Sequence, residues 1–158
     1  MTDKKKNVGK IFEKEFKDSV PDDCYLERYK DDTSGFYGVS NPGDFRLYKY
    51  PVLLILELKS HKGKSLPLSK IRENQLKGML KAVTYYGVYG GYLINFRDLE
   101  ETYFLSAGYV LDFFQCGERK SIPVTYCRDY GIRIPQKKKR TLYTYDLREW
   151  LGRYAGDL

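Results

Sequence analysis

The sequence predicts an α/β protein in which a mixed central sheet is flanked by helices. The run Pro51-Val52-Leu53-Leu54-Ile55-Leu56 is uniformly aliphatic, which is typical of a central strand covered on both faces. Apolar residues recur at helical spacing before this run, over residues 8–20, and again near the end of the chain, over residues 146–154. The 158 residues, 42% of them apolar, suit one compact core. We therefore expect a single domain over residues 1–158, with a flexible basic N-terminus at residues 1–6.

The remaining elements follow from start, stop and turn signals along the chain. Pro21 ends the first helix, and Ser69 is expected to cap a later helix that stops at Gly87. The polar stretch over residues 31–43 is a loop by its turn chemistry, and it leads the chain to Asp44. In order, we expect a helix over 8–20, strands over 25–29, 44–47 and 52–59, a helix from 69 to about 86, strands over 90–96 and 102–105, a short helix or strand over 109–115, and a helix over 146–154.

The charge balance favours a polyanionic partner. Lys and Arg number 28 against 21 Asp and Glu, which gives a net charge of +7 and a pI near 9.2. We expect this partner to be nucleic acid rather than a membrane surface. The excess positive charge is concentrated in Lys4-Lys5-Lys6, in Lys62 and Lys64, and in Lys137-Lys138-Lys139-Arg140.

Membrane and export signals are not expected from this sequence. No apolar stretch reaches the ~18 residues that a membrane span needs, and the first residues lead into lysines rather than into the apolar segment of a signal peptide. The three cysteines are odd in number and lack paired metal-ligand spacing, so we expect free thiols in a reducing compartment. Together these features predict a cytoplasmic protein.

Asp44 and the tripeptide Glu57-Leu58-Lys59 are the strongest candidates for chemistry. Side chains alternate along a strand, so Glu57 and Lys59 leave on one face and can share a site with Asp44 from a neighbouring strand. Carboxylate oxygens bind Mg²⁺, and an adjacent ammonium can stabilise what reacts with it. The pattern indicates a metal-dependent phosphodiesterase core. For the tripeptide alone, a solvated strand end with an ordinary Glu and Lys is the more frequent explanation.

Two helices add polar candidates. Gln75 shares a predicted helix face with apolar residues, and a buried amide there would need a partner such as a carboxylate, a phosphate or a backbone group. In the first helix, Glu15 falls near the centre of the apolar stripe, whereas Glu13 lies at its edge. Periodicity alone does not decide which of these two carboxylates reaches the site.

An ordered series of segments carries a family resemblance. The series consists of Gly9–Glu13, Gly43–Phe45, Leu56–Ser60, Leu66–Ile71 with Gln75, Gly90–Ile94, Ser121–Pro123 and Gly131–Pro135. Over most of its length the chain resembles the RecU-type Holliday-junction resolvases of the PD-(D/E)xK nuclease superfamily. The resemblance implies a restriction-endonuclease-like core and a Mg²⁺-dependent endonuclease, with Mn²⁺ as a substitute ion. It also implies resolution of four-way DNA junctions by paired nicks, in the cytoplasm of a bacterial cell or a phage-infected host. Because one site cuts one strand at a time, we expect the chain to act as a homodimer.

The resemblance implies roles for individual residues. Lys59 would orient or activate the attacking water, and Gln75 would support the lysine and the metal site. The metal ligands would be Asp44, Glu57, Glu13 and the Leu58 carbonyl. Cellular members of the family insert a long basic stalk between residues 25 and 43, where this sequence has only a short loop. Such a shortened form would suit a bacteriophage or mobile-element enzyme.

Two alternative functions remain open at this point. One is an endonuclease of the same core that cuts duplex or branched DNA without junction preference. The other is a catalytically silent DNA-binding recombination factor, against which the intact acidic and lysine set argues. Lys62, Lys64 and the Lys137–Arg140 run are candidate DNA contacts or, alternatively, parts of a solvated loop and turn. The homodimer interface is expected around Tyr85, Tyr86, Tyr103 and Phe104.

Overall fold

A computed structural model describes residues 7–30 and 41–156. The predicted flexible N-terminus, residues 1–6, and most of the predicted loop over residues 31–43 lie outside this described part. The elements are α1 (Val8–Ser19), β1 (Tyr25–Arg28), β2 (Phe45–Lys49), β3 (Val52–His61), β4 (Ser65–Pro67), η1 (Leu68–Lys70), α2 (Glu73–Ala82), β5 (Val88–Phe96), η2 (Arg97–Leu99), β6 (Glu101–Ser106), α3 (Ala107–Cys116), β7 (Ser121–Pro123), α4 (Val124–Tyr130), β8 (Ile132–Arg133), β9 (Gln136–Lys139), β10 (Leu142–Tyr145) and α5 (Arg148–Ala155), where η marks a short 3₁₀ helix.

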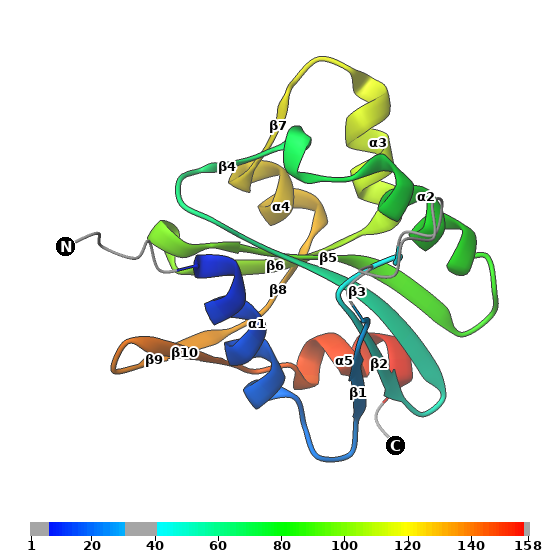
Figure 1. Ribbon diagram of the computed structural model, residues 1–158, viewed down its shortest axis with the longest axis vertical. Coiled ribbons are helices and arrows are strands. Elements are labelled where there is room, and N and C mark those ends of the chain that lie inside the picture. The colour runs from blue at the N-terminus through cyan, green and yellow to red at the C-terminus, as the bar shows by residue number, and fades with distance from the viewer. Residues whose placement is uncertain (1–6, 31–40, 157–158) are drawn as a thin grey trace.

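The core is a six-stranded mixed sheet in the order β1-β2-β3-β5-β6-β8. Strand β3 pairs in parallel with β5, and the other neighbouring strands in this sheet are antiparallel. Figure 1 shows α1, α5 and the β9–β10 hairpin on one side of the sheet and α2, α3 and α4 on the other. The prediction of a mixed sheet flanked by helices, with the aliphatic run at its centre, is confirmed.

Two hydrophobic clusters fill the space between the sheet and these two layers. One joins Phe12 and Phe16 of α1 and Trp150 of α5 to the sheet, and the other joins Leu76 and Met79 of α2 to its opposite face. Alternation along β3 sends Leu54, Leu56 and Leu58 into the first cluster and Ile55 into the second. Glu57 and Lys59 therefore leave β3 on the face that α2 covers.

The structure corrects the predicted helix over residues 69–86. Ser69 lies in η1, whereas α2 begins only at Glu73 and ends at Ala82. Between the two helices, Ile71 has extended backbone angles (φ −102°, ψ 116°) and a buried side chain, so its burial in the core interrupts the helix. The expected cap does not form, because Arg72 occupies that position without a side-chain hydrogen bond.

Other boundaries agree closely with the sequence pattern. The first helix extends from Val8 to Ser19, capped by the Asn7 side chain, and the ambiguous segment over residues 109–115 is helical within α3. The small β4–β7 sheet, α4, β8 and the β9–β10 hairpin were not predicted. In the described residues, no helix is both long and apolar enough to cross a bilayer.

Candidate active site

Asp44 is held against the backbone of β3. Its amide nitrogen donates to the Leu56 carbonyl at 2.8 Å, and its Oδ2 accepts from the Leu58 amide nitrogen, also at 2.8 Å. The residue before it must be small, because a Cβ added at Gly43 would lie 2.6 Å from the Leu56 carbonyl oxygen. The Gly43-Asp44 pair thus brings one carboxylate to the strand that carries Glu57.

Glu57 is contacted by the ammonium group of Lys59 and by the side-chain amide of Gln75. Its side chain is 4% exposed, and the Lys59 Nζ lies 2.9 Å from its Oε1. The Gln75 Nε2 donates to its Oε2 at 3.4 Å, from helix α2. Gln75 is buried, as its position on the apolar face of the helix predicts. The structure therefore brings together four of the predicted residues: Asp44, Glu57, Lys59 and Gln75.

These side chains line a cleft of about 300 Å³. Most of the side chains that line the cleft are polar or charged. Its lining consists of Glu13, Arg28, Tyr29, Asn41, Gly43, Asp44, Glu57, Leu58, Lys59, Arg72 and Gln75. Sequence reasoning missed Arg28, Tyr29, Asn41 and Arg72. Arg28 and Tyr29 lie at the end of a predicted strand, and only the pairing of that strand with β2 could have placed them beside Asp44.

The electrostatics of the cleft favour a bound cation. Burial, then the neighbouring Glu57 and to a lesser extent Glu13, raise the pKa of Asp44 to about 7, against the lowering effect of the Leu58 N–H and of Lys59. A positive ion between the carboxylates would reverse this repulsion. In the described part of the chain, no group of three or more His, Cys, Asp or Glu side chains has the arrangement of a metal cage. Mg²⁺ fits such a site, since it usually binds through one or two carboxylates and keeps several waters.

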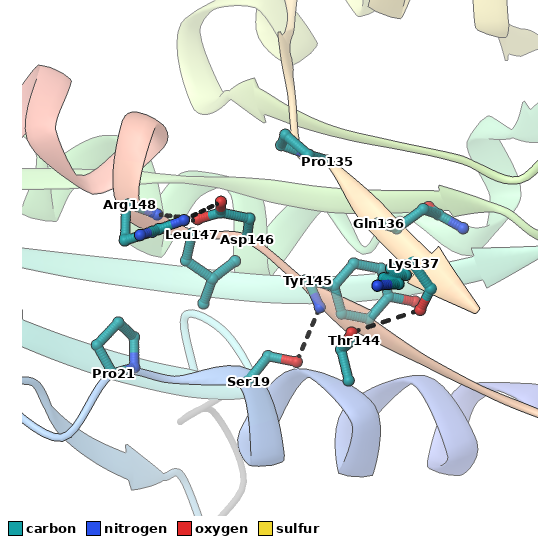
Figure 2. Close-up of a pocket in the computed structure, with 10 residues that line it drawn as sticks. All are labelled: Ser19, Pro21, Pro135, Gln136, Lys137, Thr144, Tyr145, Asp146, Leu147 and Arg148. Atoms are coloured by element: carbon teal, nitrogen blue, oxygen red, sulfur yellow. Dashed lines mark hydrogen bonds and ion pairs between the residues drawn. The ribbon is translucent and has the colours of Figure 1, made fainter. Parts of the chain in front are cut away.

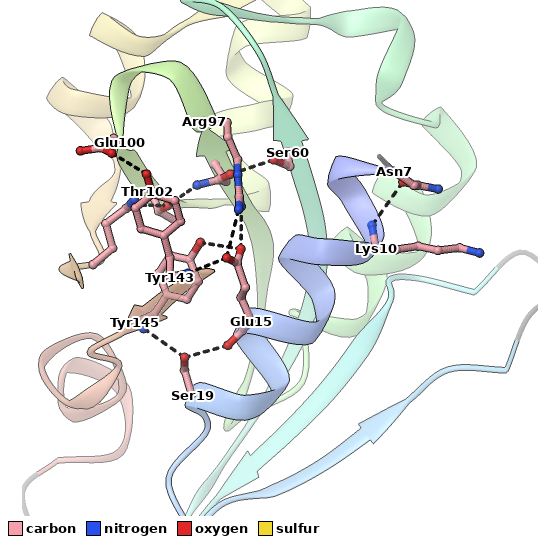
Figure 3. Close-up of polar contacts among 12 residues, drawn as sticks. Asn7, Lys10, Glu15, Ser19, Ser60, Arg97, Glu100, Thr102, Tyr143 and Tyr145 are labelled. Carbon is pink, nitrogen blue, oxygen red and sulfur yellow. Dashed lines mark hydrogen bonds and ion pairs between the residues drawn. The ribbon is translucent and has the colours of Figure 1, made fainter. Parts of the chain in front are cut away.

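The structure separates the two glutamates of α1. Glu13 lines the cleft, where its Oε2 accepts from the Arg28 Nε at 3.2 Å. Glu15 is 3% exposed and faces the β9–β10 hairpin. It accepts two hydrogen bonds, of 2.5 and 3.0 Å, from Arg97 of η2. It also accepts from the Tyr143 backbone nitrogen at 2.6 Å (Figure 3). Glu13 is therefore the α1 carboxylate that reaches the cleft, and metal binding by it remains a prediction.

A second hollow lies between the end of α1, the hairpin and the start of α5 (Figure 2). It is larger, at about 470 Å³, but several of its polar groups are already paired with one another. Asp146 binds Arg148 at 2.7 Å, and Ser19 accepts from the Tyr145 backbone nitrogen at 3.0 Å. The smaller cleft, where acidic groups converge and raise one pKa, is the better candidate for chemistry.

Comparison with known proteins identifies the family. The family model described as RecU, Recombination protein U, matches residues 48–147. The chain belongs to the RecU family. The matched range contains Glu57, Lys59 and Gln75, whereas Glu13 and Asp44 precede it.

Among the proteins similar to this RecU family chain are two sequence relatives and one solved structure. An SPbeta prophage-derived uncharacterized protein, YotM of Bacillus subtilis strain 168, is 30% identical over 167 residues, with 92% of this chain and 86% of that protein aligned. The Holliday junction resolvase RecU of Lactococcus lactis subsp. cremoris SK11 is 34% identical over 77 residues, which cover 48% of this chain and 36% of that protein. A solved structure of Archaeoglobus fulgidus Hjc, a Holliday junction resolvase, gives a TM-score of 0.49 at 15% identity, covering 70% of this chain and 83% of that one.

The predicted DNA contacts of this RecU family chain lie outside the cleft. Lys62 and Lys64 are exposed in the turn after β3, which also carries Glu57 and Lys59. Lys137, Lys138 and Lys139 are exposed on β9, and Arg140 has a positive φ of 60° at the hairpin turn. The run is therefore an exposed hairpin rather than an irregular turn, and its binding to DNA remains a prediction. His61 lies beside Lys70, and burial together with that lysine lowers its pKa.

Half of the expected dimer patch is wrong. Tyr103 and Phe104 are 3% and 1% exposed because β6 lies inside the sheet, where both side chains pack into the core of their own chain. Tyr85 and Tyr86 are exposed, at 65% and 107%. The four residues therefore do not form one surface.

Proposed function

We propose that the chain is a structure-selective DNA endonuclease that resolves four-way junctions by paired nicks, using Mg²⁺ or, as a substitute, Mn²⁺. The observation that carries the proposal is the cleft in which burial and the neighbouring Glu57 raise the pKa of Asp44 to about 7, with Lys59 beside Glu57. Membership of the RecU family, several of whose members are named Holliday junction resolvases, supports the junction as substrate. The aligned segments cover about a third of the length of those resolvases. Junction resolution by this chain is therefore proposed here rather than taken over from them.

In this proposal Asp44 and Glu57 hold the ion, with the Leu58 carbonyl and Glu13 as further ligands. A bound divalent ion supplies charge neutralisation at the phosphate and an acidified water. Lys59 is 2.9 Å from Glu57 in the present structure. With Glu57 bound to a cation, the Lys59 ammonium would be able to hold the attacking water or to stabilise the phosphorane charge. Gln75 keeps the Glu57 carboxylate in place from α2.

The basic residues supply affinity rather than chemistry. Lys62 and Lys64 lie in the turn that follows β3, the strand that carries Glu57 and Lys59. The Lys137–Arg140 hairpin offers a second exposed positive surface. Phosphate contacts of this kind position a nuclease on DNA without reading its sequence. We propose DNA as partner for both surfaces, and the bacterial or phage-infected cytoplasm as the place of action.

We further propose that residues 1–158 form one nuclease domain that acts as a homodimer. One cleft cuts one strand at a time, whereas a four-way junction is resolved by two nicks on opposing strands. Two clefts related by a twofold axis match that symmetry. Light scattering at micromolar concentration, with and without a junction, measures the assembly; a particle near the 18.6 kDa of one chain in both conditions would contradict the dimer.

The cleavage test uses a four-way junction and a linear duplex of the same sequence, each in Mg²⁺. Glu57→Gln and Lys59→Ala are expected to abolish cleavage and to leave DNA binding largely intact. Glu73→Gln and Lys77→Ala are matched controls, because both residues are exposed on α2 and neither lines the cleft. Wild-type rates from either cleft variant would contradict the site.

The same assay separates the alternative functions. Equal cutting of duplex and junction would indicate an endonuclease without junction preference. Binding without any cutting in Mg²⁺ or Mn²⁺ would indicate a silent recombination factor. Paired nicks at symmetric positions in the junction alone are the result that the proposal expects.

A further inference from the structure

Two buried polar atoms on the α2 side of the sheet lack a hydrogen-bond partner among the described residues. They are the Gln75 Oε1 and the Tyr92 hydroxyl. Most buried polar groups in native proteins are paired, so each exception calls for an explanation. Gln75 is already bound to Glu57 through its Nε2, which directs attention to the surroundings of that carboxylate.

Tyr92 is the direct neighbour of Glu57 in the sheet. The two residues are register partners in the parallel β3–β5 ladder, so their side chains leave the sheet on the same face. Tyr92 is 0% exposed. Burial raises the pKa of its phenol, and the nearby Glu57 charge raises it further.

The Tyr92 hydroxyl destabilises the fold as long as it has no hydrogen-bond partner. The next residues of β5 on this face, Ile94 and Phe96, are apolar and fully buried. A phenylalanine would fill the same space without a polar atom, whereas a buried donor without a partner carries the full cost of its desolvation. A group retained at such a cost beside a proposed metal ligand is explained best by a role at that ligand.

We propose that Tyr92 is a positioning residue for Glu57, acting through one bridging water that it shares with Gln75. The water would accept from the Tyr92 hydroxyl and donate to the Gln75 Oε1 and to the Glu57 carboxylate. This arrangement gives a hydrogen-bond partner to both the Gln75 Oε1 and the Tyr92 hydroxyl. It also fixes one Glu57 carboxylate oxygen, so that the other oxygen would be free to face the cation. The inference rests on the proposed function, because it assigns Glu57 to metal binding.

The holding contacts matter most once a cation is present. In the present structure Glu57 is fixed mainly by Lys59, at 2.9 Å, while the Gln75 contact is longer, at 3.4 Å. With a cation bound, Glu57 would face that ion instead of Lys59, and the orientation of the carboxylate would depend on Gln75, Tyr92 and their water. Removing such an outer contact usually weakens metal affinity about 10- to 100-fold.

The test compares Tyr92→Phe with Tyr154→Phe. Tyr154 is a matched control because it is a half-buried tyrosine on α5, which packs on the opposite face of the sheet. Mn²⁺ affinity is measured by calorimetric titration of the full chain, and the melting temperature is measured in EDTA. We expect Tyr92→Phe to weaken Mn²⁺ binding about 10-fold or more with an equal or higher metal-free melting temperature, and Tyr154→Phe to leave Mn²⁺ affinity unchanged.

A double variant tests the shared water. If Tyr92 and Gln75 act through one water, Tyr92→Phe combined with Gln75→Ala should weaken binding by much less than the product of the two single effects. Mn²⁺ affinity of Tyr92→Phe within twofold of wild type would overturn the inference while leaving the proposed function in place. A wild-type chain that binds no Mn²⁺ and cuts no DNA would overturn both.

Discussion

Asp44→Asn should stabilise the metal-free protein and abolish its activity. The pKa of Asp44 is about 7 in the folded protein, chiefly because of burial and of Glu57, against 3.8 as the ordinary value. Between these two pH values the folded chain holds a proton that the unfolded chain releases. The free energy of unfolding therefore falls as pH rises through this window, and the loss is complete above about pH 7. Asparagine has no charge to lose, and its Oδ1 can still accept from the Leu58 N–H.

The magnitude follows from the distance between the two pKa values. They lie about three apart, and each pKa unit corresponds to about 1.4 kcal/mol, which sets an upper limit of about 4 kcal/mol. Partial solvent access reduces this figure, and about half of it, roughly 2 kcal/mol, is the expected gain. For a chain of this length, that free energy corresponds to a rise in melting temperature of about 6 °C.

Differential scanning calorimetry in EDTA, at about pH 5 and about pH 8, measures the effect. The melting temperature of Asp44→Asn should exceed that of wild type by more at the higher pH. Asp22→Asn, an exposed acid outside the cleft, is the control and should show no such dependence. Mn²⁺ should then raise the melting temperature of wild type only. A difference between variant and wild type that does not change with pH would refute the reasoning.

Three further predictions concern the cleft, the hairpin and the network between them. Gln75→Ala should slow junction cleavage without abolishing it, since the amide orients Glu57 and supplies no charge; single-turnover rates as low as those of Asp44→Ala would contradict this. Alanine at all three positions of Lys137–Lys139 should lower DNA affinity and reduce the log–log salt slope by about one unit per lost phosphate contact, with junction preference retained; an unchanged slope in titrations would exclude the hairpin from the interface. Glu15→Gln should lower the free energy of unfolding in urea by about 3 kcal/mol, because it leaves a largely buried Arg97 without its carboxylate; a stability equal to that of wild type would mean that the pair is dispensable.

The sequence predicts the central strand and two residues of the cleft, Glu57 and Lys59, for local reasons. A uniform aliphatic run requires cover on both faces, and β3 has it. The period of two in a strand places Glu57 and Lys59 on one face whatever the rest of the fold is. Because both consequences depend on a few adjacent residues, they could be stated without knowing the topology.

What escaped prediction depends on distant contacts. Glu13 and Glu15 are two positions apart on one helix, and their different roles are decided by Arg28 and by Arg97, the latter 82 residues away from Glu15. The late start of α2 depends on the burial of Ile71 in the core. Neither contact can be read from the pattern of its own segment.

The one parallel pair in the main sheet has a consequence for how the cleft assembles during folding. Strands β2 and β3 are adjacent in sequence, so their pairing brings Asp44 and Glu57 together through short-range contacts. The β3–β5 pair needs a long crossover, and that crossover contains α2 with Gln75. Closing it costs more chain entropy than closing the hairpin. A refolding chain therefore assembles the two carboxylates first and adds the amide later, so that divalent ions present during refolding meet an acidic pair before its supporting helix has docked.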